Sequence, residues 1–464
     1  PGGFKGSSPV TDEKIIAKID WNINDQHRAS FVYNWNDGFT ISESDSGSTR
    51  VSFDGHFYER GAEVETTVLS LFSDWTDNFS TELRIGNTTL DNRQISVDAA
   101  TGFGEVQIRV PGGATVYLGP DDSRQANDLN WEADTFKLAG TYYHGDHTIT
   151  AGVEYENLNV FNLFMQHRIG EYRFNSIEDF RNGTPARIYY NNAAGTNDPN
   201  DVAASFEYAN TTFYIQDKWN ATDDLTLTLG LRYDEWSSDD RPVYNSAFEA
   251  DYGYANTNNL DGISLLQPRV GFNYTVDDQL EIRGGFGIYS GGNPNVWVSN
   301  AYSNNGVVQV FARERNIPGF EARTTSIFDL DLVGGGNAIY APSQALFDYV
   351  RDFPTNGSSR FVVAIDPDYD MPSEDKYALG FTYLSDQDYL IQGDLLYTKK
   401  QDAAIYLETA RTQSGTAPDG RPTFTGSNST YILSNVAGNS GDATTLSLAV
   451  SKEFDNGIDM TFAY

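Results

Sequence analysis

The sequence predicts an all-β protein: a transmembrane, antiparallel, up-and-down β-barrel with about 14 strands in this segment. Three observations favour this fold class. Runs of about ten residues alternate apolar and polar side chains. These runs come in pairs joined by a few polar residues, and long polar connections separate the pairs. No stretch approaches the ~18 consecutive apolar residues that a membrane helix needs.

The first pair of runs shows the alternation. Ile15, Ile19 and Trp21 share one face of the expected strand, whereas Lys18 and Asp20 share the other. A short polar turn follows, and the alternation then resumes. Because two alternating runs around a tight turn are typical of a hairpin, each pair predicts one antiparallel hairpin. The seven turns lie at 24–27, 77–78, 144–147, 221–224, 277–279, 385–388 and 455–457.

Tight turns and long connections alternate strictly along the chain. The connections have roughly 30 to 80 residues, for example 36–66, 236–266 and 290–373. A soluble sandwich or propeller would mix its loop lengths at both ends, whereas outer-membrane barrels keep short turns on the periplasmic side and long loops outside. One such strand alone would fit a half-buried strand of a soluble sheet. Seven pairs in fixed alternation favour a barrel, which must close because unpaired backbone groups are costly in hydrocarbon.

Aromatic residues lie beside the tight turns, and a second group lies about a membrane thickness away. We expect the two groups to form girdles at the two bilayer interfaces, where amphipathic rings are most stable. The predicted girdle residues are Trp21, Trp35, Trp75, Trp219, Tyr233, Tyr274, Tyr383 and Tyr397.

Charged residues at alternate strand positions indicate the opposite face. A charge facing lipid costs ~2–4 kcal/mol near the midplane, so these side chains should point into the lumen. The predicted lumen-facing residues are Lys18, Asp20, Glu82, Arg84, Arg232, Arg269, Glu281 and Arg283.

The composition excludes several classes of function. The chain carries 31 Lys+Arg against 65 Asp+Glu, a formal net charge of −34, and no Cys. Such a surplus of acid repels phosphate backbones, so we expect no nucleic-acid partner. Without Cys, a disulfide scaffold and a thiol nucleophile are excluded.

Much of the acid falls in the expected outer connections, where it would raise the local concentration of cations. One interpretation is capture of a cationic or metal-chelated ligand. The interpretation we prefer is a solvated surface that divalent ions bridge to lipopolysaccharide, with outer-membrane lipid and lipopolysaccharide as its partners.

Patterns for catalysis or metal binding are weak. His144 and His147 bracket a tight turn and do not predict a metal site. Asp366, Asp368 and Asp370 have the odd spacing of a calcium loop, but the segment lacks the glycine and the bidentate glutamate that an EF-hand needs. No nucleophile elbow or hydrolase pattern occurs. We therefore expect no enzyme activity, no cofactor and no metal site.

The direction of the strands predicts that the chain is a piece of a longer barrel. If the tight turns are periplasmic, the first strand runs inward and the last runs outward. Bacterial barrels normally keep both ends in the periplasm, so these strands should be an incomplete set. We expect residues 1–464 to be a partial outer-membrane barrel with long extracellular loops, and Tyr464 to be a break rather than a natural terminus.

Two pairs of segments resemble the barrels of TonB-dependent receptors. They are YIQDKW at 214–219 with LTLTLGLRYD at 225–234, and QPRVGFNY at 267–274 with LEIRGGFG at 280–287. Three more segments resemble the Oar-like branch, whose members carry a carboxypeptidase-regulatory-like N-terminal domain. They lie at 13–33, 119–138 and 162–180, so the likeness extends over nearly the whole chain.

The resemblance implies a barrel of about 22 strands in a Gram-negative outer membrane. Such a barrel is occluded by an N-terminal plug and energised through TonB, ExbB and ExbD. We expect the plug, the TonB box, the regulatory-like domain and the final strands to lie outside these residues. The implied function is energised uptake of an unidentified ligand across the outer membrane.

Two alternatives remain open. A passive porin has a similar strand pattern, and a surface interaction or structural protein would use its long loops to dock a surface lipoprotein or another outer-membrane partner. The longest connection is where we expect a ligand or partner to bind, since loops carry such contacts. The candidate contact residues are Trp297, Tyr302, Phe311, Phe320 and Tyr340.

Overall fold

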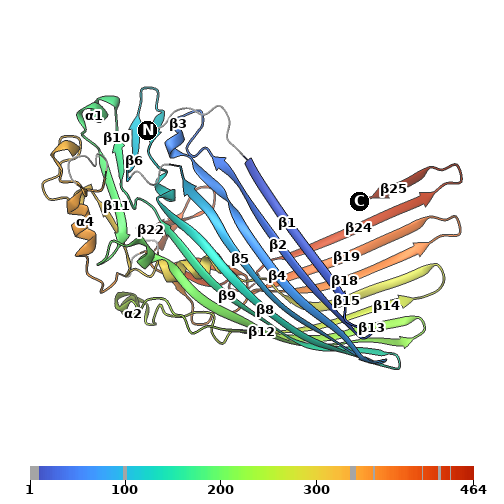
Figure 1. Cartoon of the computed structure of the whole chain (residues 1–464). Coiled ribbons are helices and arrows are strands. Elements are labelled where there is room, and N and C mark those ends of the chain that lie inside the picture. Colours follow the sequence, from blue (N-terminus) through green and yellow to red (C-terminus); the bar gives the residue numbers. More distant parts are fainter. Residues whose placement is uncertain are drawn as a thin grey trace.

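The computed structural model describes residues 10–97, 102–334, 341–358, 361–409, 411–426, 430–438 and 440–464. Its main element is one curved sheet of 14 strands in which each strand pairs with the next along the sheet, always antiparallel (Figure 1). This sheet confirms the predicted fold class and all seven hairpins. Its strands are β1 (Val10–Asn22), β2 (His27–Ser42), β4 (Tyr58–Thr76), β5 (Phe79–Ser96), β8 (Ala126–His144), β9 (His147–Met165), β12 (Ala204–Thr222), β13 (Leu225–Ser237), β14 (Ser264–Thr275), β15 (Leu280–Ser290), β18 (Ser373–Leu384), β19 (Leu390–Gln401), β24 (Asp442–Glu453) and β25 (Asp459–Ala463).

The first long connection is shorter than the sequence pattern predicted. We expected a loop over 36–66, but β2 continues to Ser42 and β4 already begins at Tyr58. The two strands stay in register to their ends, with Ser42 opposite Tyr58. The apolar alternation stops earlier because the face that carries Ile19 and Phe31 continues here with the acidic residues Asp37, Glu59 and Glu63. The other two connections that we delimited begin and end within two residues of the expected positions.

The two faces of the sheet differ in chemistry. One face, called the apolar face here, exposes residues such as Ile19, Leu229 and Leu379. The other, called the polar face, carries Lys18 and Arg283 at the alternate positions. Register fixes this division, because a shift of one residue would exchange the two faces.

The long connections fold into a second body at the end of the sheet opposite the tight turns (Figure 1). We call it the outer layer. Its largest part is a six-stranded sheet formed by β16 (Gln309–Arg313), β11 (Arg187–Ala193), β10 (Glu171–Phe174), β6 (Glu105–Arg109), β7 (Thr115–Leu118) and β3 (Arg50–Ser52).

Four different connections therefore contribute to this one small sheet. Smaller sheets join β17 (Val363–Ile365), β23 (Tyr431–Asn435) and β20 (Ala404–Glu408), and also β21 (Thr412–Thr416) and β22 (Pro422–Thr425). The helices of the described residues are α1 (Ile177–Asn182), α2 (Ser246–Tyr252), α3 (Asn295–Ser303) and α4 (Gln344–Arg351). None of them is long and apolar enough to cross a membrane.

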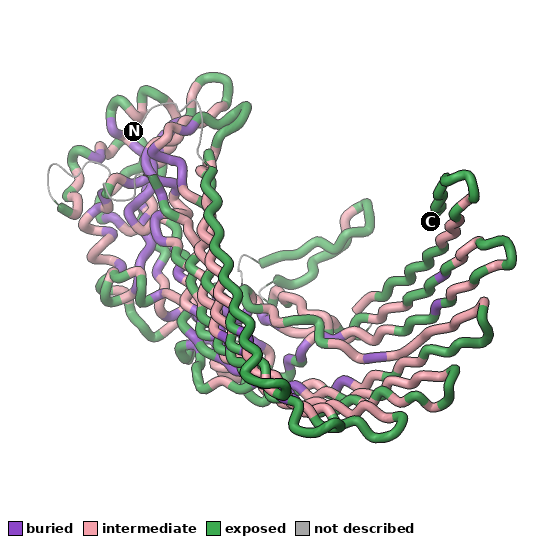
Figure 2. Tube along the Cα trace, turned by 45° about the vertical axis from the view of Figure 1, so that its right-hand side comes forward, coloured by how far each residue is buried: buried purple, intermediate pink, exposed green. Residues whose placement is uncertain are grey.

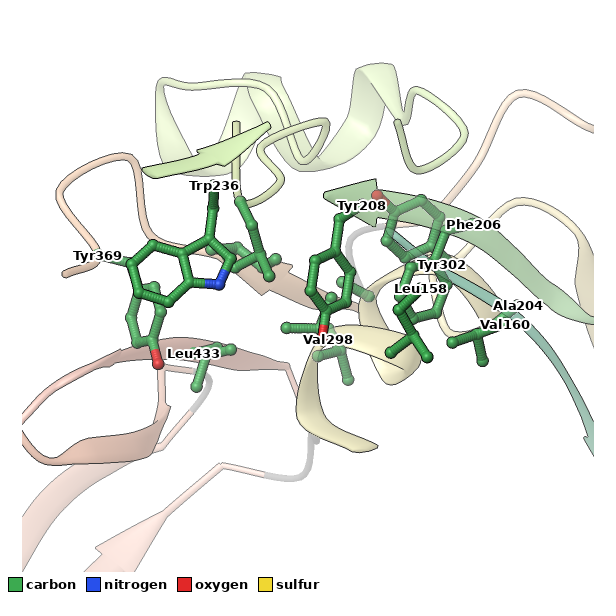
Figure 3. Packing of buried hydrophobic residues seen from close by; sticks show 14 of the residues in the cluster. Leu158, Val160, Ala204, Phe206, Tyr208, Trp236, Val298, Tyr302, Tyr369 and Leu433 are labelled. Carbon is green, nitrogen blue, oxygen red and sulfur yellow. The ribbon is translucent and has the colours of Figure 1, made fainter. Parts of the chain in front are cut away.

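The described residues form four buried apolar clusters, and the two largest hold most of the outer layer. One lies within the six-stranded sheet and includes Tyr172, Ile188 and Leu346. The other joins the outer layer to the ends of β9, β12 and β13. In it, Phe206 and Tyr302 stack at 4.6 Å and Trp236 is 1% exposed (Figure 3). Buried residues therefore gather at this end of the molecule, whereas the hairpin ends are exposed (Figure 2).

Candidate functional site: the polar face of the sheet and the outer layer

The charges predicted to face the lumen are paired with one another along the polar face. Lys18 Nζ lies 3.0 Å from Asp20 Oδ2. Glu82 accepts from Arg84 at 2.8 Å and lies 2.9 Å from the ammonium of Lys137 on the next strand. Opposite charges on neighbouring strands of one face, such as Glu82 and Lys137, stabilise a sheet by roughly 0.2–1 kcal/mol per pair.

The same arrangement continues across the later strands. Arg232 contacts Glu154 at 3.0 Å and Asp234 at 2.8 Å. Arg283 contacts Asp394 of β19 at 2.6 Å, reaching across β18. That bridge passes over Gly380, where a Cβ would require the Asp394 carboxylate to shift.

The two remaining predicted lumen residues make other contacts. The guanidinium of Arg269 lies 4.5 Å from the ring centre of Tyr289, a cation–π geometry. Glu281 lies near the hairpin end, in register with Thr275 of β14 and Thr382 of β18.

A groove of about 900 Å³ lies on the polar face between β12 and β19. Its lining includes four basic side chains, those of Lys218, Arg269, Arg283 and Lys376. Among the described lining residues, Asp394 is the single carboxylate. The groove is therefore basic although the whole chain has a net charge of −34.

The predicted girdle residues form two rows. Trp35 pairs in register with Ile15, six positions along β1 from Trp21. Tyr233 pairs with Phe213, six positions along β12 from Trp219. At the rise of a strand, these six positions span about 20 Å, somewhat less than the ~25 Å height of an apolar band.

Three of the eight predicted girdle rings are exposed on the apolar face, and the other five are half-buried. Trp21 and Trp75 are 62% and 55% exposed, and Tyr274 is exposed as well. Trp219 stacks on His147 at 5.3 Å near the hairpin ends. Tyr383 and Tyr397 lie six positions apart in the paired strands β18 and β19, the latter in register with Tyr377. Their role at the membrane interface stays a prediction.

The aromatic residues expected to meet a ligand differ in accessibility. Phe311 is 53% exposed and lies 6.2 Å from the ring of Phe361. Trp297 stacks on Tyr406 at 4.9 Å and packs partly buried against the core at the strand ends. Among the predicted contact residues that the structure describes, Phe311 therefore offers the most surface.

The others are less available for contact. Tyr302 is 7% exposed, and its hydroxyl donates to the Asp240 carbonyl at 2.8 Å, so this side chain supports the loop from within. Phe320 packs against the core of the six-stranded sheet. Tyr340 lies outside the described residues.

The residues of the weak metal-binding patterns contact other protein groups in the structure. His147 Nδ1 lies 2.7 Å from Asp217 Oδ2, while His144 stacks on Tyr142 at 5.9 Å. Asp366 accepts from the Asp368 amide and from the Ser434 hydroxyl, which fixes a turn.

Sequence reasoning missed a buried cluster of ionisable groups in the outer layer. Glu105 and Glu171 are 1% and 0% exposed, and Asp122 and His167 lie beside them. Burial, together with the carboxylates of Asp122 and Glu171, raises the pKa of Glu105 well above its usual range. Burial also raises the pKa of Asp122 to about 6. The only spacing signal is the separation of four residues between His167 and Glu171; the sequence gives no sign that Glu105 and Asp122, from another connection, lie beside them.

Acidic residues also line two hollows near the outer ends of the strands. One of about 410 Å³ includes Glu207, Asp239 and Asp240, and one of about 350 Å³ includes Glu63 and Glu132. Both lie where the sequence places much of its acid.

The strand order, the one-sided tight turns and the folded outer connections define an outer-membrane β-barrel. Residues 3–464 match the family model described as outer membrane beta barrel domain, and the chain belongs to this family. The protein is thus located in the outer membrane. No curated protein sequence matches the chain.

Solved structures with a similar fold are outer-membrane receptors and transporters. The outer membrane transporter YddB from Escherichia coli has a TM-score of 0.56 at 13% identity, with 96% of this chain and 45% of that chain covered. A mutant of the ferric enterobactin receptor PfeA from Pseudomonas aeruginosa has a TM-score of 0.53 at 11% identity over 96% and 49%. The siderophore receptor PirA from Acinetobacter baumannii has a TM-score of 0.52 at 12% identity over 97% and 52%. The chain spans about half the length of these structures.

Proposed function

We propose that this chain is the barrel portion of a TonB-dependent receptor of the Oar-like branch, which takes up a ligand with energy from TonB, ExbB and ExbD. The observation that carries the proposal is the combination of a charged polar face with a folded outer layer on one continuous sheet. A ligand would bind at the outer layer and pass along the polar face. The motifs at 214–234 and 267–287 support the same assignment.

The basic groove suggests which solutes the path favours. Lys218, Arg269, Arg283 and Lys376 face one region of the polar face, so an anionic ligand or an acidic face of a plug would be attracted there. The acid of the outer hollows would repel free anions and attract cations. We propose an anionic ligand that carries bound cations, since such a ligand can interact with both regions.

Energised uptake is tested in cells that carry the complete gene. Deleting this gene and deleting the TonB gene should produce the same growth defect on the same members of a panel of single nutrient sources. A protonophore should abolish the gene-dependent uptake within minutes, because TonB transmits the proton-motive force. Gene-dependent uptake that survives both treatments would exclude the proposal.

The porin alternative predicts a different electrical behaviour. The purified full-length protein should conduct little in planar bilayers if a plug fills the barrel. A porin would conduct steadily, and the double variant Lys218→Glu/Arg269→Glu would then shift its ion selectivity towards cations. The complete reading frame provides a further check, since the Oar-like branch requires an encoded plug and regulatory-like domain.

A surface interaction role is the second candidate. The outer layer has its own apolar core and exposes Phe311. A simple pore does not require a folded layer of this kind at its opening. If docking is the main function, Phe311→Ser would abolish co-purification of a partner without any nutrient-dependent growth defect.

A further inference from the structure

The buried cluster of the outer layer brings two glutamates face to face. In the parallel pairing of β6 with β10, Glu105 lies directly opposite Glu171. Both side chains are withdrawn from water, at 1% and 0% exposure. Like charges at such positions destabilise a sheet, and burying them costs several kcal/mol more unless they are compensated.

Two further groups complete the cluster from neighbouring segments. Asp122 comes from the connection between β5 and β8, and His167 from the connection between β9 and β12. The donor atoms of Asp122, His167 and Glu171 all lie within 4.8 Å of one another. His167 Nδ1 is 2.8 Å from Glu171 Oε2 and 3.1 Å from Asp122 Oδ2.

Most of the carboxylate oxygens are already occupied. Glu105 accepts from the Gln107 amide and from the Asp122 backbone N–H, each at 2.6 Å. Glu171 Oε1 accepts from Arg173 Nε. These hydrogen bonds fix the positions of the two glutamate side chains.

Two polar atoms at the centre of the cluster are not occupied in this way. Among the described residues, neither Glu171 Oε2 nor His167 Nδ1 has a hydrogen-bond partner, although both are buried. Their mutual contact is close, but it lacks hydrogen-bond geometry. A buried carboxylate oxygen without a hydrogen bond is costly, and a cation bound by both groups would compensate this cost.

The spacing of these atoms fits ligands of a single cation. Two ligands that are each about 2.1 Å from a zinc ion lie about 3.0 Å apart at a right angle and about 3.4 Å apart at a tetrahedral angle. The observed separations of 2.8 and 3.1 Å are close to the smaller value, and small side-chain rotations would reach the larger one. A cation would also neutralise negative charge of Asp122, Glu171 and the nearby Glu105. The guanidinium of Arg173 already pairs with Glu171.

We propose that Asp122, His167 and Glu171 bind a divalent transition-metal cation, with Zn²⁺ as the best match, while Arg173 positions Glu171 and Glu105 positions Asp122. The imidazole nitrogen selects zinc-like ions over calcium, which takes oxygen ligands. The ion joins the β5–β8 connection to the β9–β12 connection and so stabilises the six-stranded sheet. This site is independent of what the receptor transports.

Zinc binding is tested on the purified full-length protein in detergent, first stripped with a chelator. Calorimetric titration with Zn²⁺, with metal content measured by mass spectrometry, should give one tightly bound zinc per chain. Glu171→Gln and His167→Asn each remove a proposed ligand and should weaken that affinity by at least the roughly tenfold that loss of a supporting outer group costs. Equal zinc affinity in the wild type and both variants would overturn the proposal.

Two matched controls separate this site from adventitious binding. Glu178→Gln changes an exposed glutamate of the same connection, and His144→Ala/His147→Ala removes the histidines of a tight turn. Both should keep the high-affinity zinc. If the double histidine variant loses it instead, the zinc is bound at the turn and the proposal is wrong.

A spectroscopic measurement covers the case in which the variants fail to assemble. X-ray absorption of the zinc-loaded wild type should show only nitrogen and oxygen neighbours, including one imidazole, at about 2.0–2.2 Å. A shell without imidazole, or retention of calcium in place of zinc, would contradict the assignment. Limited proteolysis adds a functional readout: chelation should speed cleavage between 102 and 200 in the wild type and leave Glu171→Gln unchanged.

Discussion

At the scale of single residues, the chemistry of the sheet depends on which way each side chain points. Leu229 and Thr228 are neighbours on β13, yet Leu229 lies on the apolar face and Thr228 borders the basic groove. Alternation in the sequence was sufficient to separate the two. Their predicted surroundings, lipid for one and lumen for the other, can be tested directly.

Placing arginine at each of the two positions should have unequal effects. Leu229→Arg puts a charge on the lipid side, which costs ~2–4 kcal/mol near the midplane, so the yield of folded protein in the outer membrane should fall strongly. Thr228→Arg adds a charge to a polar face and should be tolerated. Heat-modifiable mobility on gels measures the folded fraction, and equal loss in both variants would contradict the facing assignment.

The aromatic contact candidates of the longest connection show what the sequence pattern alone does not decide. All of these candidates are aromatic residues of one long connection: Trp297, Tyr302, Phe311 and Phe320. Their sequence context gives no reason to prefer one of them as a contact residue. The structure buries Tyr302 and leaves Phe311 exposed. Aromatic side chains serve equally well as a small core and as a binding surface, so only packing can tell them apart.

At the scale of elements, close approach of strands restricts certain positions. Gly271 of β14 and Gly285 of β15 are direct partners in the sheet. A methyl group at Gly285 would lie 2.6 Å from the Val270 carbonyl oxygen, which is backbone and cannot move freely. The same group at Gly271 would meet its nearest neighbour at an ordinary 3.8 Å.

Gly285→Ala should therefore destabilise the β14–β15 hairpin, whereas Gly271→Ala should not. Overpacking of this type costs typically about 1–3 kcal/mol. The expected result is a lower unfolding temperature in detergent for Gly285→Ala, with Gly271→Ala close to the wild type. Should the two variants unfold at the same temperature, the close backbone approach at Gly285 would not be a stability determinant.

Hairpins were the elements that the sequence predicted best. Strict alternation such as 225–233 and an acidic tight turn are local signals, and the seven predicted turns all occur. The extended ends of β2 and β4 were not predicted, since they project beyond the apolar band and lose the alternation. The short strands of the outer layer had no such signal because each has seven residues or fewer.

At the scale of the whole molecule, one apolar core connects the outer layer to the barrel strands. Trp236 at the end of β13 is 1% exposed, and its indole N–H donates to Asn293 in the longest connection at 3.1 Å. Val298 and Leu433 approach the same core from α3 and β23 (Figure 3). This core determines how firmly the loops are held above the strands.

Trp236→Ala should loosen the outer layer and leave the strands assembled. Replacing a buried large aromatic side chain by alanine costs typically about 3–5 kcal/mol. We expect proteases added to intact cells to cleave the 238–262 and 291–372 connections faster, while heat-modifiable mobility stays normal. Phe311→Ala, at an exposed position, is the control and should leave cleavage unchanged. Loss of the folded barrel in Trp236→Ala would show that this core also supports the strands.

The sequence by itself determined the fold class, the facing of the strand residues and the location in a membrane. Each follows from a local period of two and from the cost of placing a charge or an unpaired backbone group in lipid. Only the tertiary structure decided which loop aromatics are buried and which carboxylates meet. Glu105, Asp122, His167 and Glu171 are brought together by connections that pair with one another beyond the ends of the long strands, and such long-range pairing leaves no periodic trace in the chain.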